Sequence, residues 1–104
     1  MSETRYYLTL TEVSECVHLS TETVILCVDH GIVEPQGDNP REWRFDPDML
    51  HRLRRAYRLQ KDLELDWAAI ALALSLTEEM QALRAQNRRL RQQLALLMEL
   101  DNPG

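Results

Sequence analysis

A heptad pattern in the last third of the chain constrains the fold more than any other feature of the sequence. Apolar residues recur there in alternating steps of four and three, which is typical of helices that pair in a coiled coil. Asn87 is the one polar residue in the series, and a lone asparagine in such a core costs stability while it fixes register and partner number. The series comprises Leu76, Met80, Leu83, Asn87, Leu90, Leu94 and Leu97.

Two short helices joined by a tight turn are predicted near the N-terminus. After residues 5–10, which suit a short strand, Thr11 is expected to cap the first helix. Ser20 caps the second helix, which ends at Gly31, a residue suited to a left-handed C-terminal cap. Because only residues 18–20 separate the two helices, the pair has the signature of a helix-turn-helix.

A hairpin and two further helices are predicted to follow. Turn-forming residues in the middle of residues 32–45 predict a hairpin, or wing, directly after the second helix. Asp46 and Pro47 are suited to begin a helix. That helix should break at residues 63–65, and Asp66 should cap a fourth helix that is separate from the heptad helix.

These elements predict a mainly α protein in three parts. Residues 1–75 form a winged helix-turn-helix domain, residues 76–100 a C-terminal coiled-coil dimerisation helix, and residues 101–104 a disordered tail. The heptad stripe could instead pack within one protomer, as in a single-chain bundle. Because little chain follows the stripe to cover it, we expect a homodimer that pairs through residues 76–97.

Charge is distributed in blocks of alternating sign. The net charge is −5, and an acidic chain is an unpromising binder of nucleic acid or anionic membranes unless its basic residues cluster. Residues 1–40 carry seven acidic residues and one basic residue, whereas residues 41–61 carry seven basic residues and three acidic ones. Such blocks are typical of solvated helix faces, but they can also align two copies of a chain or select a basic partner.

The sequence does not predict catalysis, a cofactor or a metal site. Cys16 and Cys27 lie on apolar helix faces without a CxxC motif, so we expect two small core residues rather than metal ligands or a disulfide. The three glycines are too dispersed for a phosphate-binding loop. We expect a non-enzyme, and because no membrane span or signal peptide is recognised, a cytoplasmic protein that does not contact the membrane.

Several segments resemble known helix-turn-helix proteins. Those that resemble the MerR family of regulators are Leu10-Thr11-Glu12-Val13, Ser20, Gly31-Ile32-Val33 with Pro35, and Trp43-Arg44-Phe45. A closer resemblance, to the chaperone modulatory proteins of the CbpM type, is carried by Val33-Glu34-Pro35, Leu63-Glu64-Leu65-Asp66-Trp67, Ile70-Ala71-Leu72-Ala73-Leu74 and Gln86-Asn87-Arg88-Arg89-Leu90-Arg91-Gln92.

The resemblance implies a MerR-like fold and a partner. Proteins of the CbpM type inhibit the DnaJ-like co-chaperone CbpA, so this chain would bind the J-domain of such a co-chaperone and block its interaction with Hsp70 (DnaK). The resemblance also implies the bacterial cytosol, and an antiparallel pairing of the C-terminal helices as in MerR-like relatives. The alternative is a MerR-like DNA-binding transcriptional regulator or nucleoid-associated protein, in which a dimer would double the basic residues of residues 41–61.

The second helix departs from the DNA-binding pattern of the MerR family. Residues 22–29 contain no Arg, Lys or aromatic residue, and Glu22 would repel phosphates, so we do not expect direct DNA binding. An acidic face suits the basic helix that J-domains present to Hsp70, with apolar residues as anchors. Any of these residues could instead be a solvated charge or a core side chain. The candidate partner-binding residues are Glu12, Glu15, Glu22, Leu26, Asp29, Asp66 and Trp67.

Overall fold

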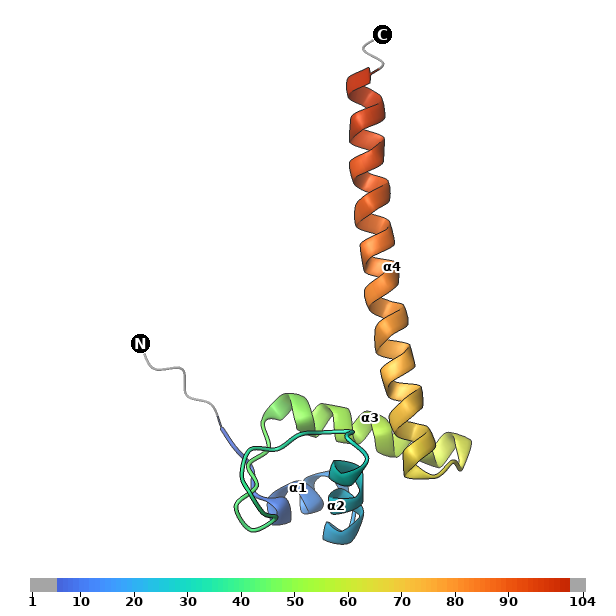
Figure 1. The fold of residues 1–104 in the computed structure, drawn as a ribbon. Coiled ribbons are helices and arrows are strands. Elements are labelled where there is room, and N and C mark those ends of the chain that lie inside the picture. Colours follow the sequence, from blue (N-terminus) through green and yellow to red (C-terminus); the bar gives the residue numbers. More distant parts are fainter. Residues whose placement is uncertain (1–5, 102–104) are drawn as a thin grey trace, which may run out of the picture. The chain divides into compact units, whose positions relative to one another are not determined.

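The computed structural model describes residues 6–101, which contain four α-helices (Figure 1). The chain divides into two compact units, Met1–Leu74 and Ser75–Gly104. The mainly helical fold expected from the sequence is confirmed. The helices are α1 (Leu10–Val17), α2 (Thr21–Asp29), α3 (Pro47–Leu63) and α4 (Trp67–Asp101).

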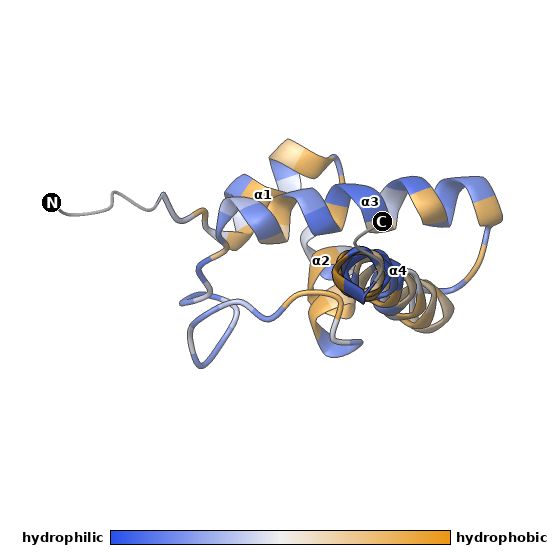
Figure 2. Ribbon diagram, turned by 90° about the horizontal axis from the view of Figure 1, so that it is seen from above, coloured by the Kyte–Doolittle hydropathy of each residue, from blue (hydrophilic) through white to orange (hydrophobic). Residues whose placement is uncertain are grey.

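The core of the first unit is built from all four helices and from the segments that flank the wing. α1 packs against both α2 and α3. Blue and orange residues alternate along α3 in Figure 2, the pattern of an amphipathic helix with one apolar face. The buried residues are Val13, Val17, Val24, Cys27, Ile32, Val33, Phe45, Leu53, Ala56, Ile70 and Leu74.

α1 begins two residues earlier than expected. Its N-terminal cap is Thr9 rather than Thr11, because Glu12 three residues later completes a reciprocal capping box with Thr9. The prediction of Thr11 as the cap is therefore wrong. α1 ends at Val17, and its C-terminal cap His18 is an exposed residue in the left-handed conformation with φ 59°.

α2 has the boundaries that its sequence signals predict. Ser20 is confirmed as the N-terminal cap, and its hydroxyl accepts a hydrogen bond from the Thr23 amide at 3.1 Å. Gly31, just beyond the helix, has φ +76° and open space where a Cβ would lie. Backbone conformation, rather than crowding, therefore explains this glycine.

The wing is held by two isolated β-bridges rather than by regular strands in the described residues. Leu8 pairs with Phe45 through backbone hydrogen bonds of 2.8 and 2.9 Å, and Gln36 pairs with Arg44. The expected strand over residues 5–10 is reduced to the bridge at Leu8, and Arg5 lies outside the described residues.

α3 is capped as predicted, with the Asp46 carboxylate accepting from the Met49 amide at 2.9 Å and Pro47 in the first turn. The predicted break after it is confirmed, because Glu64 adopts the left-handed conformation with φ 52°. Asp66 then caps α4, as expected, by accepting from the Ala69 amide at 2.8 Å.

The predicted separation between a fourth helix and the heptad helix is wrong. α4 runs without interruption for 35 residues from Trp67 to Asp101. Ser75, where the separation was expected, has no Gly or Pro beside it to end a helix. Of the tail expected at residues 101–104, Asp101 is the last residue of α4, and residues 102–104 lie outside the described residues.

The two cysteines lie in different environments. Cys27 is buried as expected, and desolvation raises the pKa of its thiol to about 12. The prediction of Cys16 as a core residue is wrong, because its side chain is exposed. The buried stripe of α1 is formed by Val13 and Val17, four residues apart, and Cys16 lies at its edge.

Candidate partner-binding surface

The outward face of α2 combines two carboxylates with one apolar side chain. Glu22, Leu26 and Asp29 follow one another at steps of four and three, so they lie on one face of the helix. All three are exposed, and Leu26 exposes 41% of its surface. The opposite face holds Val24 and Cys27 in the core. The structure thus places three of the candidate residues together, and we call these three the α2 stripe.

The electrostatics of α2 favour cations near its C-terminal end. α2 has no basic residue in its last turn, where the carbonyl ends of the helix carry partial negative charge. Asp29 adds a full negative charge at the same end. A cationic group approaching this end therefore meets both attractions.

The two candidate residues of α1 differ in what their side chains do. Glu15 is exposed, and its carboxylate is available to solvent. Glu12 is also exposed, but its Oε1 accepts a hydrogen bond from the Thr9 amide at 2.9 Å. That hydrogen bond, with a further contribution from the Thr9 side chain, lowers the pKa of Glu12 below its ordinary value. Glu12 therefore stabilises the start of α1.

The remaining two candidates belong to the connection between α3 and α4. Asp66 is exposed, with one carboxylate oxygen engaged in capping α4. Trp67 is partly buried and packs against the hydrophobic core of the first unit. Leu26 is thus exposed on its helix face, whereas part of the Trp67 side chain is already used in folding.

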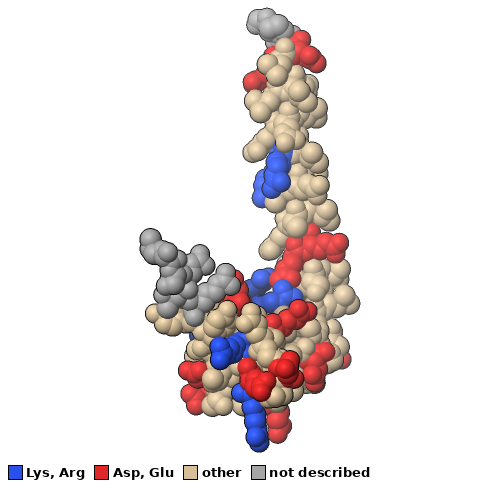
Figure 3. Space-filling view, turned by 60° about the vertical axis from the view of Figure 1, so that its left-hand side comes forward, with Lys and Arg blue, Asp and Glu red and all other residues tan. Residues whose placement is uncertain are grey.

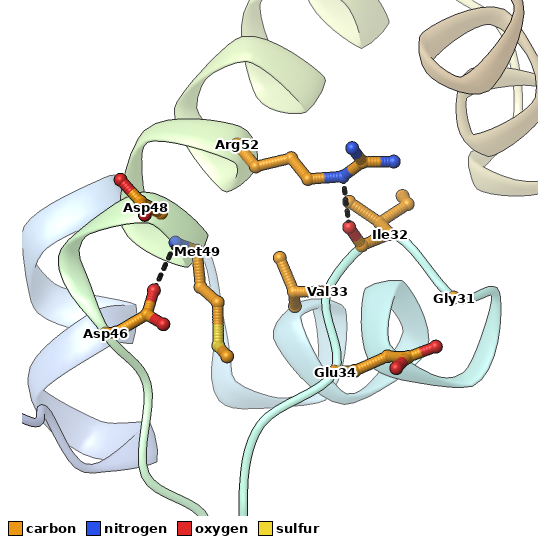
Figure 4. Close-up of a pocket in the computed structure, with 8 residues that line it drawn as sticks. All are labelled: Gly31, Ile32, Val33, Glu34, Asp46, Asp48, Met49 and Arg52. Atoms are coloured by element: carbon orange, nitrogen blue, oxygen red, sulfur yellow. Dashed lines mark hydrogen bonds between the residues drawn. The ribbon is translucent and has the colours of Figure 1, made fainter. Parts of the chain in front are cut away.

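An acidic pocket adjoins the end of α2 that carries Asp29. The pocket has a volume of about 490 Å³ and extends from Gly31 to the first turns of α3. Figure 4 shows the Arg52 side chain reaching from α3 to the carbonyl of Ile32, to which its Nε donates a hydrogen bond. Three carboxylates line the pocket against that one cation. The carboxylates are those of Glu34, Asp46 and Asp48.

Sequence reasoning did not assign this pocket. Asp46 and Asp48 belong to residues 41–61, whose net charge is positive. Their proximity to Glu34 does not follow from that charge pattern. The cap role of Asp46 indicates only where α3 begins. Only the folded chain brings the start of α3 and the segment that follows α2 together.

Basic side chains form separate exposed groups. Arg41 and Arg44 are exposed on the wing, while the run on α3 is largely exposed apart from Arg52. Figure 3 shows both acidic and basic groups on one face of the first unit. The exposed basic residues of α3 are Arg54, Arg55, Arg58 and Lys61.

The heptad stripe of α4 is open to solvent in this single chain. Its six apolar members expose between 48% and 59% of their surfaces, and Asn87 is also exposed. A hollow of about 460 Å³ follows the middle of the stripe, lined by Met80, Leu83 and Asn87 together with three arginines. Such a series of exposed leucines on one helix marks an interaction surface.

The described residues show neither a group of metal ligands nor a membrane-spanning helix. Between residues 6 and 101, no three His, Cys, Asp or Glu side chains come together in a group that could hold a metal ion. In the same part of the chain, none of the helices has the length and hydropathy needed to cross a membrane.

Comparison with known proteins places the chain in a family. A family model described as "MerR HTH family regulatory protein" matches residues 8–92. The chain is 46% identical over 82 residues to the chaperone modulatory protein CbpM of Pseudomonas entomophila, covering 79% of this chain and 81% of that protein. The CbpM of Pseudomonas putida is 44% identical over the same shares of both chains. That of Coxiella burnetii is 37% identical over 83 residues, covering 80% of this chain and 78% of that protein.

These matches span the helix-turn-helix, the wing and most of α4, and they agree with the fold described above. The chain belongs to the MerR helix-turn-helix regulatory family and, within it, to the chaperone modulatory proteins CbpM.

Proposed function

We propose that this chain is a chaperone modulator that binds the J-domain of a DnaJ-like co-chaperone of the CbpA type and blocks its interaction with Hsp70 (DnaK). The name of the relatives supports a modulatory role, regulatory rather than catalytic. The observation that carries the proposal is the α2 stripe. The helix that reads DNA in MerR-family regulators here offers a partner two carboxylates and a leucine, and no basic residue.

The mechanism is occlusion of a basic surface. Glu22 and Asp29 lie seven residues apart, about 10 Å along the helix axis, which suits two positive charges on an opposing helix. These charges would speed the encounter and fix its register. Leu26, between them, would be the apolar group that loses water on contact and slows dissociation. The acidic pocket adds negative charge beside the C-terminal end of α2.

The proposed active form is a homodimer that pairs through the heptad stripe of residues 76–97. Pairing would bury the exposed leucines and place Asn87 in the seam, where it restricts register. The dimer would present two copies of the α2 stripe. We propose that it acts in the cytoplasm and reaches DNA only through its partner.

The proposal is tested by competition. The purified chain is added to a CbpA-type J-domain and Hsp70, and the J-domain-stimulated ATPase activity of Hsp70 is measured. We expect inhibition that saturates with the chain and is reversed by excess J-domain, with no effect on the basal ATPase. Unchanged stimulation, together with a mobility shift of genomic DNA fragments by the chain alone, would favour the DNA-binding alternative instead.

A further inference from the structure

A second pocket, of about 280 Å³, lies between the C-terminal end of α1 and the basic face of α3. It is unlike the acidic pocket, because none of the described residues that line it is acidic. α1 and the turn after it contribute one wall, and α3 contributes the other. The lining residues are Cys16, Val17, His18, Arg54, Tyr57, Arg58 and Lys61.

Three basic side chains line this pocket, and no acidic residue of the described part of the chain lines it with them. Arg54, Arg58 and Lys61 follow one another at steps of four and three, so they share one face of α3. Like charges at this spacing destabilise a helix. Within residues 6–101, no carboxylate forms an ion pair with any of the three. The chain is acidic overall, so this local excess of positive charge is not a consequence of its composition.

Tyr57 helps to shape the pocket. The Lys61 ammonium lies 5.6 Å from the centre of the Tyr57 ring, a cation–π contact that restrains the lysine at the pocket. Each arginine presents a planar fork of N–H donors that matches the oxygen atoms of a phosphate group. The volume accommodates a phosphate group and part of the small molecule that carries it.

We propose that this pocket binds a phosphate group, free or as a small phosphate ester, through Arg54, Arg58 and Lys61. The site is separate from the α2 stripe, and the inference does not depend on the proposed binding of a J-domain. The competing structural explanation is that the three cations only complement the carbonyl end of α1, which has no basic residue in its own last turn.

Cys16 provides a built-in reporter, because its exposed thiol lines the pocket whereas Cys27 is buried. The rate at which 4,4′-dithiodipyridine, an uncharged disulfide, modifies Cys16 is measured in inorganic phosphate and in sodium chloride of equal ionic strength. The Cys16→Ser variant lacks the exposed thiol, so the modification that it loses is the part that occurs at Cys16. A bound phosphate covers the thiol, which lines the same pocket, so we expect modification to be about threefold slower in millimolar phosphate than in chloride.

The Arg54→Gln/Arg58→Gln double variant should lose this protection, and Arg41→Gln, which removes an exposed wing arginine outside the pocket, should retain it. Thermal unfolding provides a second readout. Phosphate should raise the midpoint of the wild type and of Arg41→Gln but not that of the double variant. Equal modification rates in phosphate and chloride, or protection that survives in the double variant, would overturn the proposal. A double variant that is merely less stable, without any phosphate effect in the wild type, would support the α1 explanation instead.

Discussion

Thr9 and Glu12 exchange hydrogen bonds across the first turn of α1. The Thr9 amide donates to Glu12 Oε1 at 2.9 Å, and the Glu12 amide donates to Thr9 Oγ1 at 3.2 Å. One of the acidic residues expected to face the partner thus holds the start of the helix-turn-helix. Glu12 therefore has a structural role at the start of α1, whereas Glu22 and Asp29 of the α2 stripe are left for partner binding.

Removing the capping pair should lower stability without changing partner binding at neutral pH. Thr9→Ala should cost about 1 kcal/mol of unfolding free energy, typical of a lost N-terminal cap. Because the pKa of Glu12 is lowered in the folded state, its contribution is present at neutral pH and is lost as the pH falls through that lowered pKa. The stability difference between wild type and Glu12→Ala should therefore shrink in acid. Urea unfolding at neutral and acidic pH measures it, and a difference that grows in acid would contradict this role.

Gly31 and Gly37 form a matched pair for testing backbone strain. Both have positive φ, but an added Cβ at Gly31 meets open space, whereas at Gly37 it would lie 2.6 Å from the Glu42 carbonyl oxygen. Gly31→Ala should cost about 1–2 kcal/mol through its left-handed conformation alone. Gly37→Ala should cost more, because the wing must also move. Chemical denaturation measures the free energy of unfolding of both variants. Equal decreases would show that the wing moves away from the Gly37 contact at little energetic cost.

Dimerisation should depend on the heptad stripe and not on apolar exposure in general. Leu83→Glu/Leu90→Glu places two charges in the proposed seam and should give a monomer by light scattering. Leu96→Glu is the control, because Leu96 is exposed to a similar extent but lies off the stripe. Truncation after Thr77 should also give a monomer. A dimer that persists in both the seam variant and the truncated chain would place the interface elsewhere.

The basic run of α3 should not contribute to inhibition of the co-chaperone. Arg54 and Arg55 are exposed on α3, whereas the proposed contact lies on α2. We expect Arg54→Ala/Arg55→Ala to retain inhibition of J-domain-stimulated ATPase within about twofold of wild type, since exposed charges remote from a contact change affinity little. Circular dichroism verifies the fold. A loss of inhibition in a folded double variant would move the partner to the basic face.

Local signals were sufficient to predict much of the fold. Ser20, Asp46 and Asp66 cap helices as their residue types indicate, and the break near Glu64 follows from the loss of periodicity. The cap at Thr9 was missed although Thr9 and Glu12 form the capping-box spacing, because the preceding residues read as extended.

Features that depend on tertiary packing were not accessible from the sequence. The exposure of Cys16 depends on how narrow the buried stripe of α1 is once α2 and α3 have packed. The hydrogen bond from Arg52 to the Ile32 carbonyl joins segments twenty residues apart, and no periodic pattern encodes it. The acidic pocket and the pocket between α1 and α3 likewise bring together side chains from separate segments.

The α2 stripe is the surface proposed to receive a basic partner, and association kinetics with an isolated CbpA-type J-domain test that role most directly. Glu22→Lys/Asp29→Lys reverses the charge of the stripe, and Asp38→Lys/Glu42→Lys makes the same change in net charge on the exposed wing. We expect the stripe variant to associate about tenfold more slowly than wild type at low salt and within about twofold at high salt, because exposed charges act through screened long-range attraction. The wing variant should remain close to wild type at both salt concentrations. A folded stripe variant whose association rate and salt dependence match those of the wing variant would show that the α2 stripe does not receive the partner.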